Sequence, residues 1–391
     1  LTWRKSSNNH FGVHLSYESS VSSIFSAQMA LGHAQSVNVY VVPTAKIASN
    51  GFHRRRRVCA VKMASTSGSS TYEQGKLDRP NWSGETTLSR IVGAMIAFKP
   101  LYSLMKLGAR QLLISTAEKK NVPWRKMTKE ILESDVYSEF DTVRNPAIVY
   151  PDYYLSPFHA YDEGNLTWLA AAEAEAATMS MELRAIPTAT TVKEANEQVR
   201  GNWLRTIETH HSQYTNSPIL DIIDIGCSIG VSTRHLADFY PSAQVTGLDL
   251  SPYFLSVAKH KERKLGSREK PINWVHANGE DTSLPSQSFD LVSISAVLHE
   301  CPERAIINLA KESFRLLRPG GTIAIMDQSP KSKILQELPP ALFTLLKSTE
   351  PFLDEYHLTD LEGRLKEAGF VNVTVKLTDP RHMTTTATVP L

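Results

Sequence analysis

The segment that decides the fold reads Ile222-Ile223-Asp224-Ile225-Gly226-Cys227-Ser228-Ile229-Gly230. Its first half is a short apolar run of the kind that forms a buried β-strand, and the glycines that follow are typical of a tight turn before a helix. Glycine is needed in such a turn where the backbone takes unusual dihedrals or where a ligand lies against the main chain. The segment therefore predicts a strand, a tight turn and the start of a helix.

A second apolar run, Gln244-Val245-Thr246-Gly247-Leu248, ends in Asp249. In a doubly wound sheet, the carboxylate at this position accepts hydrogen bonds from a ribose diol. Pyrophosphate binders have Gly-x-Gly-x-x-Gly in the preceding turn, whereas this turn is Gly226-x-Ser228-x-Gly230 with Asp224 before it. A carboxylate there would repel a pyrophosphate. It suits an adenosine ligand with positive charge, such as S-adenosyl-L-methionine with its sulfonium and ammonium groups.

At this point the sequence resembles the class I S-adenosylmethionine-dependent methyltransferases, and among them the methyltransferases of ubiquinone and menaquinone biosynthesis. The resemblance covers roughly residues 219–390 and rests on ordered signals. They are the glycine turn, Asn278-Gly279-Glu280-Asp281 after a third strand, Leu284-Pro285-Ser286-Gln287-Ser288-Phe289-Asp290 before a fourth, and Leu316-Leu317-Arg318-Pro319-Gly320-Gly321 before a fifth. The fold that the resemblance implies is α/β and Rossmann-like: a seven-stranded doubly wound sheet with a C-terminal β-hairpin over 371–377 and 383–389.

The resemblance also assigns cofactor-binding residues. Asp224 is expected to orient the methionine ammonium, Asp249 to bind the ribose hydroxyls, and Ser295 to lie beside the methionine portion. The other expected cofactor contacts are Gly226, Cys227, Ser228, Gly230, Leu250, Asn278 and Gly279. Ser228 departs from the family pattern by replacing a glycine, which is tolerable if its dihedrals are ordinary. Asn278 replaces an aspartate, and its amide oxygen can still accept from adenine.

For the acceptor side, the candidate catalytic residues are His299, Asp327 and His159. Methyl transfer is an in-line displacement that depends mostly on positioning, and a base is needed only if the acceptor must lose a proton. His299 follows the fourth strand and Asp327 ends the fifth, where open α/β sheets place reactive groups. A histidine has a neutral form at about pH 7 and can act as a base. The alternative for His299 is a helix-capping or supporting role.

His159 belongs to an aromatic segment, 150–168, which resembles one in uncharacterised plastid and cyanobacterial methyltransferases. There it precedes the catalytic domain, and N-terminal segments of the wider family commonly cap the substrate pocket. We therefore expect Tyr154, His159 and Tyr161 to help line the acceptor pocket. A surface loop held together by its own aromatic side chains is the alternative.

Composition divides the 391 residues, of net charge +2, into further parts. Residues 1–65 are poor in acids and rich in serine, with a block of arginines at 54–57, which is the composition of a disordered transit peptide for the plastid. A basic tail or nuclear signal is the alternative. A polar linker (66–88), a helical N-terminal extension or substrate cap (89–190) and the methyltransferase domain (191–391) follow.

Within the extension, 91–117 has apolar residues at helical spacing, interrupted by basic ones. It predicts a helix that lies on a membrane surface or packs on the catalytic domain. Because the three cysteines show no metal-ligand spacing, we expect no metal site. No tetrapeptide like Asn-Pro-Pro-Tyr follows the fourth strand, and no basic stripe marks 66–391, so a nucleic-acid partner is not expected.

The sequence thus predicts an S-adenosylmethionine-dependent methyltransferase of the chloroplast, in the stroma or peripherally attached to a membrane. Its acceptor is expected to be a small, possibly lipophilic and quinone-like molecule. One alternative is a non-catalytic plastid scaffold that binds S-adenosylmethionine without turnover. The other is a nicotinamide-dependent reductase, which the turn spacing and Asp224 disfavour. The methylated atom and the oligomeric state stay open.

Overall fold

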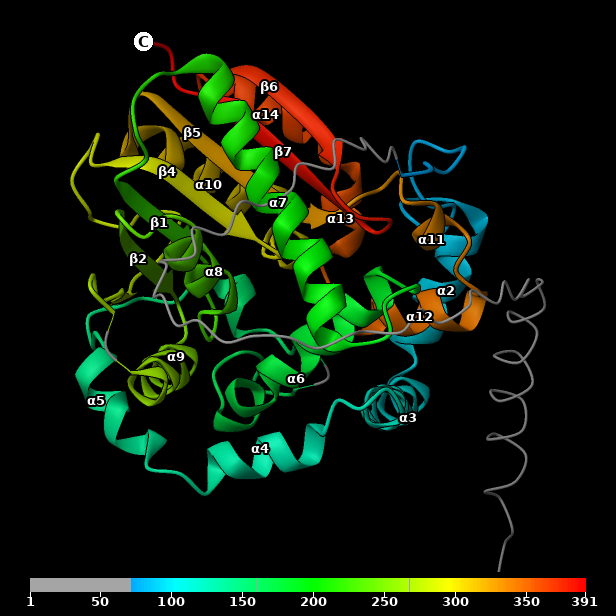
Figure 1. Cartoon of the computed structure of the whole chain (residues 1–391). Coiled ribbons are helices and arrows are strands. Elements are labelled where there is room, and N and C mark those ends of the chain that lie inside the picture. Colours follow the sequence, from blue (N-terminus) through cyan, green and yellow to red (C-terminus); the bar gives the residue numbers. More distant parts are fainter. Residues whose placement is uncertain (1–71, 160, 267) are drawn as a thin grey trace, which may run out of the picture. The chain divides into compact units, whose positions relative to one another are not determined.

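A seven-stranded sheet forms the centre of the molecule in the computed structural model, which describes residues 72–159, 161–266 and 268–391 (Figure 1). The strands are β1 (Asp221–Ile225), β2 (Gln244–Asp249), β3 (Asn273–His276), β4 (Phe289–Ser295), β5 (Leu317–Gln328), β6 (Val371–Leu377) and β7 (His382–Thr388). Their order is β3-β2-β1-β4-β5-β7-β6. β1 to β5 run parallel, whereas β7 is antiparallel to both β5 and β6. The predicted doubly wound sheet with a C-terminal hairpin is confirmed.

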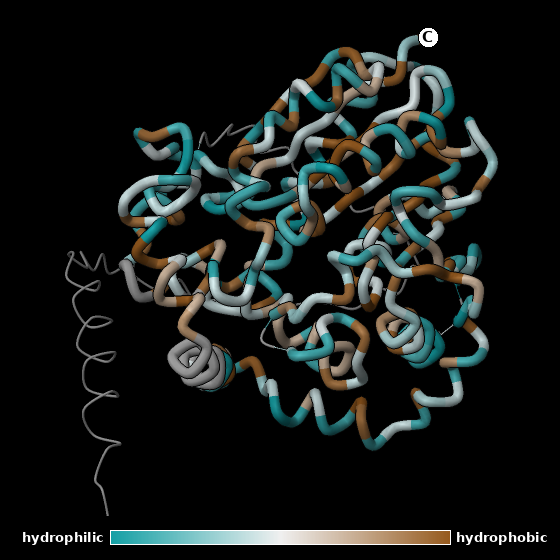
Figure 2. The backbone as a smooth tube through the Cα atoms, turned by 180° about the vertical axis from the view of Figure 1, so that it is seen from behind, coloured by the Kyte–Doolittle hydropathy of each residue, from teal (hydrophilic) through white to brown (hydrophobic). Residues whose placement is uncertain are grey.

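Helices cover both faces of this sheet. They are α2 (Thr87–Ala97), α3 (Lys99–Lys119), α4 (Trp124–Leu132), α5 (Phe140–Val143), α6 (Trp168–Ala185), α7 (Val192–Tyr214), α8 (Val231–Phe239), α9 (Pro252–Leu265), α10 (Glu303–Leu316), α11 (Lys333–Gln336), α12 (Pro340–Thr349), α13 (Leu353–Leu358) and α14 (Leu361–Glu367). Short 3₁₀ turns are η1 (Val136–Glu139), η2 (Asp152–Leu155) and η3 (Leu298–Glu300). Figure 2 shows the apolar stretches gathered in the sheet and the helices against it, with polar connections at the periphery.

The alternation of side chains along the strands builds a core on each face of the sheet. On β1, Ile223 packs with residues of α10, α13 and α14, whereas its neighbour Ile222 packs with residues of α7 and α8. On β4, Val292 and Leu291 divide between the same two cores. Strands with two buried faces read as continuous apolar runs, which is why these segments could be identified in the sequence.

In place of the single helix expected over 91–117, the structure has two helices, α2 and α3, separated at Phe98. Pro100 lies in the first turn of α3, where its missing N–H is not needed, and it would interrupt a continuous helix. Ile114 of α3 and Trp124 of α4 pack into the same core as Trp203 of α7. The extension predicted over 89–190 is therefore helical and shares a core with the sheet domain.

The predicted transit peptide lies outside the described residues, and so does the first part of the predicted linker (66–88). From residue 72 onward this segment is packed on the rest of the chain, contrary to the prediction. Trp82 is 2% exposed and stacks on Phe343 of α12, with ring centroids 5.6 Å apart. The Ser83 hydroxyl lies 3.0 Å from His357 Nδ1. One buried tryptophan orders a segment whose polar composition predicts a linker.

Among the helices that the structure describes, none combines the length and the apolar character needed to cross a bilayer.

Candidate functional site

The residues expected to bind the cofactor meet at one edge of the sheet. β3, β2, β1 and β4 are parallel neighbours, so their carboxyl ends lie side by side. Ile225, at the end of β1, is in register with Leu248 on β2 and with Ile294 on β4. The glycine turn, Asp249-Leu250, Asn278-Gly279 and Ser295 leave or end these strands, and the fold brings them together as predicted.

The turn after β1 takes a left-handed backbone at alternate residues: Gly226 has φ 72°, Ser228 φ 50° and Gly230 φ 80°. The expectation that Ser228 keeps ordinary dihedrals is therefore wrong. The left-handed backbone at Ser228 accompanies a 2.7 Å hydrogen bond from its N–H to Asp249 Oδ2, which ties the turn to β2. A non-glycine residue in this region carries strain that the surrounding structure holds in place.

Ser228→Gly is expected to raise the free energy of unfolding by about 1 kcal/mol, since glycine removes the left-handed penalty at the cost of a more flexible unfolded chain. Urea unfolding followed by circular dichroism measures this change. Ser228→Ala is the matched control, because it removes the hydroxyl and keeps Cβ. An equal gain in Ser228→Ala, or no gain in Ser228→Gly, would contradict the strain argument.

Asp224 is fully buried and serves as an anchor for three hydroxyl groups. Ser293 donates to its Oδ1 at 2.7 Å, while Ser232 and Thr233 donate to Oδ2 at 2.9 and 2.7 Å. Burial raises the pKa of Asp224, and these hydroxyls and Arg200 partly offset the rise. The structure thus gives Asp224 a role in fixing β1 to α8 and β4. Its expected contact with the methionine ammonium stays a prediction.

Asp249 is also buried, and its two oxygens accept from the backbone N–H groups of Ser228 and Ser251, each at 2.7 Å. Burial raises the pKa of this carboxyl to about 6, although the two amides favour the ionised form. A carboxylate oxygen can accept more than one hydrogen bond. Each oxygen of Asp249 therefore retains capacity for a ribose hydroxyl.

The amide groups of the turn fit a ligand without phosphate. The N–H groups of Gly226 and Cys227 both donate to Leu248 O, at 2.8 and 3.0 Å, and Gly230 N–H donates to Cys227 O at 2.8 Å. A pyrophosphate would need such groups free. With buried carboxylates at the ends of two neighbouring strands, the site suits a cationic ligand that donates hydroxyl groups, as S-adenosylmethionine does.

The remaining expected contacts lie around this edge. Asn278 is half-buried, and its amide oxygen accepts from Glu280 N–H at 3.0 Å, so part of its acceptor capacity is used within the chain. Gly279 is packed so closely that a Cβ there would lie 2.5 Å from Ile225 Cγ2. Leu250 is half-buried, and Cys227 is buried within the turn.

Ser295 reveals a buried ion pair that sequence reasoning missed. Its hydroxyl accepts from Arg200 Nη1 at 3.1 Å, and Arg200 Nε lies 3.1 Å from Glu182 Oε1. Asn196 donates to both oxygens of Glu182 at 3.1 Å. Nothing in the sequence distinguishes Glu182 of α6 and Arg200 of α7 from charged residues on a solvent-exposed helix face, because only tertiary packing buries them.

The candidate catalytic residues His299, Asp327 and His159 come together beyond the ends of β4 and β5. His299 Nδ1 lies 2.7 Å from Asp327 Oδ1. His159 Nε2 lies 2.9 Å from Glu350 Oε1 and 3.7 Å from Glu300 Oε1. Glu350, which follows α12, had not been identified from the sequence. We refer to His159, His299, Glu300 and Glu350 as the His/Glu cluster.

His299 and Asp327 form a buried, hydrogen-bonded pair. Burial alone would lower the pKa of His299, but Asp327, with Glu350 and Glu300, outweighs burial and raises the pKa to about 10. The pKa of Asp327 is lowered: burial opposes the shift, and the histidine overcomes it. The pairing with Asp327 favours the protonated form of His299, and the expectation that a neutral His299 acts as a base stays a prediction. The sequence could not show that the two residues would be partners.

Residues of the aromatic segment contact residues that follow β3 and β4. Tyr153 donates to Glu280 Oε1 at 2.8 Å, and Asn165 donates to Glu300 Oε2 at 3.1 Å. Tyr154 stacks on Tyr150, with centroids 6.1 Å apart. Burial, with the nearby Asp249 and Glu300, raises the pKa of Tyr154. The expectation that Tyr154 lines the acceptor pocket stays a prediction.

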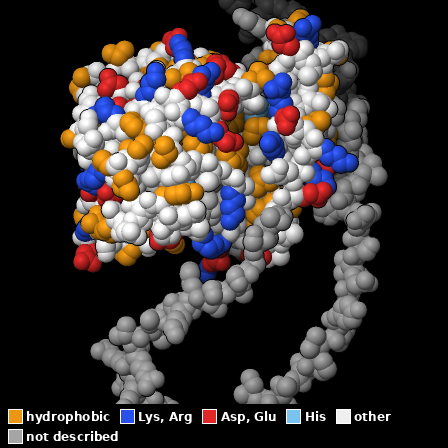
Figure 3. All heavy atoms as spheres, turned by 90° about the horizontal axis from the view of Figure 1, so that it is seen from above, with side chains coloured by type: hydrophobic (Ala, Val, Ile, Leu, Met, Phe, Trp, Pro, Cys, Tyr) orange, Lys and Arg blue, Asp and Glu red, His pale blue; other side chains and the backbone are white. Residues whose placement is uncertain are grey.

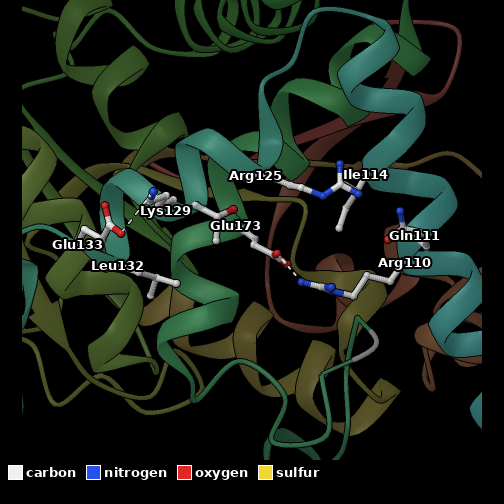
Figure 4. Close-up of a pocket in the computed structure, with 9 residues that line it drawn as sticks. Arg110, Gln111, Ile114, Arg125, Lys129, Leu132, Glu133 and Glu173 are labelled. Atoms are coloured by element: carbon white, nitrogen blue, oxygen red, sulfur yellow. Dashed lines mark hydrogen bonds and ion pairs between the residues drawn. The ribbon is translucent and has the colours of Figure 1, made fainter.

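Tyr161 has a different place. Its hydroxyl donates to Glu173 of α6, which also pairs with Arg110 of α3. Glu173 and Arg110 line an open hollow of about 360 Å³ between α3, α4 and α6, which Arg125 and Lys129 also line (Figure 4). None of the expected cofactor or catalytic residues lines this hollow. The side-chain hydroxyl of Tyr161 thus contacts α6 of the helical extension, and this contact is separate from the contacts of the His/Glu cluster.

Comparison with known proteins gives consistent matches to one kind of enzyme. The family with a methyltransferase domain matches residues 223–325. An uncharacterized methyltransferase of Synechocystis sp. is 33% identical over 157 residues, covering 40% of this chain and 69% of that protein. A demethylmenaquinone methyltransferase of Tropheryma whipplei is 28% identical over 172 residues, covering 40% of this chain and 68% of that protein. A solved phosphoethanolamine N-methyltransferase 2 of Haemonchus contortus, in complex with phosphomonomethylethanolamine and S-adenosylhomocysteine, is 17% identical, with a TM-score of 0.37 over 55% of this chain and 60% of that one.

Proposed function

Because the chain belongs to the S-adenosylmethionine-dependent methyltransferases, we propose that it methylates a small, lipophilic, quinone-like acceptor in the plastid. The observation that carries the proposal is the left-handed turn joined to Asp249, with the His/Glu cluster and Tyr154 on the acceptor side of the same sheet edge. The demethylmenaquinone methyltransferases among the relatives support a quinone-like acceptor. A protein fold alone does not fix a substrate.

The chain's own residues divide the work of the reaction between them. When bound, S-adenosylmethionine supplies an electrophilic methyl group on a sulfonium. Asp249 and the turn hold the ribose, and Asp224 keeps the turn fixed to its neighbours. In this proposal Tyr153 and Asn165, which donate to Glu280 and Glu300, help to cover the acceptor side of the edge. Holding donor and acceptor in line can supply roughly 7–11 kcal/mol of the barrier, so these positioning roles account for most of the catalysis.

The direct test incubates the purified chain with methyl-labelled S-adenosylmethionine and a panel of prenylated quinols and phenols. Mass spectrometry then measures S-adenosylhomocysteine and the methylated product. The proposal expects turnover that requires the lipophilic acceptor. S-adenosylmethionine binding with no transfer to any quinol or phenol would overturn the acceptor class and favour a scaffold.

The proposed plastid location rests on the composition of residues 1–65. Import of the labelled chain into isolated chloroplasts tests it.

Binding of S-adenosylmethionine is expected to weaken as the pH falls below about 6, since Asp249 must be ionised to accept from the ribose. The pKa of Asp249 is raised to about 6, so the carboxyl is ionised at higher pH and increasingly protonated at lower pH. One required deprotonation predicts an affinity about tenfold lower at pH ~5 than at pH ~7. Calorimetry across this range measures the change. In Asp249→Asn the same pH dependence should disappear, and a surviving slope would contradict the assignment.

A lipophilic acceptor suggests contact with a membrane, and α2 offers a surface for it. Leu88, Ile91, Met95 and Phe98 recur at helical spacing and are 36%, 55%, 40% and 62% exposed. Contiguous exposed apolar side chains mark interaction sites. α2 also contacts α12, the helix that leads to Glu350.

On the face seen in Figure 3, basic and acidic side chains are intermixed, which is more consistent with a small-molecule acceptor than with a nucleic acid.

We expect the chain to co-sediment with vesicles of plastid lipid composition and Ile91→Asp/Phe98→Asp to stay largely in the supernatant. Burying two large apolar side chains contributes roughly 3–5 kcal/mol to such binding, and a charge reverses that contribution. Arg125→Asp on α4, away from the stripe, is the control for charge alone. Equal sedimentation of the wild type and the double variant would show that α2 does not contact the membrane.

A further inference from the structure

Two imidazoles and two carboxylates converge in the His/Glu cluster, and we infer that this cluster is a binding site for a divalent transition-metal ion. One ligand atom each from His159, His299 and Glu300 lie within 4.8 Å of one another. Glu350 bridges the two histidines, with Oε1 2.9 Å from His159 Nε2 and Oε2 3.9 Å from His299 Nε2. The inference goes beyond methyl transfer and departs from the expectation, based on cysteine spacing, that the chain holds no metal.

The spacing of these atoms is close to that of a coordination shell. Imidazole nitrogen and carboxylate oxygen bind zinc at about 2.0–2.2 Å, which places neighbouring ligand atoms about 3–3.5 Å apart. Three of the separations here are 2.9 Å for His159–Glu350, 3.7 Å for His159–Glu300 and 3.9 Å for His299–Glu350, and the ligand atoms of His159, His299 and Glu300 all lie within 4.8 Å of one another. Small side-chain rotations are therefore sufficient to close the shell.

The partners of the cluster orient it in the way that metal sites require. A ligating histidine almost always gives its other ring nitrogen to a carboxylate, which fixes the ring. His299 does so through Nδ1, 2.7 Å from Asp327, and Asp327 is itself fixed by the N–H groups of Leu298 and Gln328 at 2.8 and 2.7 Å. His299 Nε2 is thereby directed at the cluster. Asn165 fixes the other ligand side chain, Glu300, by donating a hydrogen bond to its Oε2.

Glu350 supplies an independent observation that points to a missing partner. Its residue is 6% exposed, yet among the residues that the structure describes its Oε2 finds no hydrogen-bond donor. An unsatisfied buried carboxylate oxygen is costly and calls for an explanation such as an ion. His159 is also held in a left-handed backbone, φ 48°, with its N–H bonded to Thr349 O at 3.0 Å. Such strain collects at functional sites.

The ligand types select the class of ion. Imidazole favours zinc and iron, and carboxylate oxygen favours harder ions such as manganese, whereas magnesium and calcium prefer oxygen ligands alone. A two-imidazole, two-carboxylate set therefore fits Zn²⁺, Fe²⁺ or Mn²⁺. Such an ion would bind an acceptor oxygen and lower the pKa of its hydroxyl, a consequence that rests on the proposed function.

The test titrates Zn²⁺, and separately Mg²⁺, into the full chain after removal of metal with a chelator. Calorimetry is expected to show one equivalent of Zn²⁺ bound with micromolar or tighter affinity, and no comparable binding of Mg²⁺. His159→Ala and Glu350→Gln are each expected to abolish this binding. Asp327→Asn, which changes the support of His299 without removing a ligand, should weaken it about 10–100-fold. Cobalt absorption spectra of the wild type and His159→Ala report ligation independently of activity.

His382→Ala is the matched control, because His382 and Asp379 form another buried pair, 2.8 Å apart, outside the cluster. It is expected to keep the Zn²⁺ equivalent. Thermal unfolding verifies that each variant folds, and His159, which is half-exposed, is the ligand least needed for packing. Absence of Zn²⁺ binding in the wild type, or equal binding in His159→Ala and Glu350→Gln, would overturn the site. Since S-adenosylmethionine binding is measured separately, a failed metal site does not bear on the proposed methyl transfer.

Discussion

Asp249→Ala is expected to weaken S-adenosylmethionine binding about 100-fold. In the proposed binding mode the carboxylate accepts the two ribose hydroxyls, and hydrogen bonds to a charged group contribute about 1.5–3 kcal/mol each. A loss of about 3 kcal/mol corresponds to roughly a hundredfold in affinity. The substitution also leaves the N–H groups of Ser228 and Ser251 without their acceptor, which loosens the turn that carries the cofactor. Isothermal calorimetry at about pH 7.5 measures the affinity directly.

Asp290→Ala separates ligand contact from loss of a buried acceptor. Asp290 accepts from the N–H groups of Leu220 and Asp221, each at 2.9 Å, at the opposite end of β1. Its removal therefore orphans two amides just as Asp249→Ala does, but away from the cofactor edge. We expect Asp290→Ala to lose stability and to keep its affinity. Comparable affinity in wild type and Asp249→Ala, or equal losses in the two variants, would show that Asp249 does not bind the ribose.

Gly230→Ala is expected to lower the free energy of unfolding by about 3 kcal/mol. Gly230 has φ 80° and caps α8, and a left-handed backbone costs an alanine about 1–2 kcal/mol. An added Cβ would also lie 2.9 Å from Arg234 Nη1 and still closer to the Trp274 ring. Overpacking of this kind adds about 1–3 kcal/mol. Urea unfolding measures the loss, and cofactor affinity should fall with it because the turn begins here.

Gly93→Ala provides the matched control, because a Cβ on this α2 glycine meets no described atom within 4 Å. It is expected to raise stability by up to about 1 kcal/mol, as alanine does in a helix. A double-mutant cycle with Trp274→Val divides the penalty. Once the ring is gone, Gly230→Ala should cost its backbone part and the contact with the flexible Arg234 side chain, which is less than the full penalty. If the cost is unchanged in the Trp274→Val background, the clash is not the cause.

The fold followed from the sequence because its signals are local. The runs that form β1, β2, β4 and β5 are buried within a largely parallel sheet, and the glycine turn after β1 has dihedrals that few residues adopt. The same locality accounts for the cofactor edge, since adjacent parallel strands bring their ends together wherever the order of strands is known. The C-terminal strands were recognisable as β-branched runs.

The acceptor side was only partly accessible, because its residues acquire their properties from distant partners. His299 was identified, but its pKa depends on Asp327 and on Glu350, which lies beyond a different helix. Arg200 and Glu182 look like solvated helix residues until packing buries them together. Trp82 sits in a polar stretch whose composition gave no hint of burial. The assumption that Ser228 keeps ordinary dihedrals failed for another reason, because the turn itself imposes a left-handed backbone at this position.

The position of β7 has a consequence for the order in which the sheet is completed. β7 lies between β5 and β6, although it follows both of them in the chain. β6 pairs with β7 and with no other described strand, so during vectorial synthesis β6 emerges before the strand that will hold it. The β5–β7 pairing is non-local, because α11 to α14 and β6 lie between the two strands in the chain, and such pairings slow folding and leave strand edges exposed in the interim. A nascent chain stalled before β7 is thus expected to need a holding chaperone.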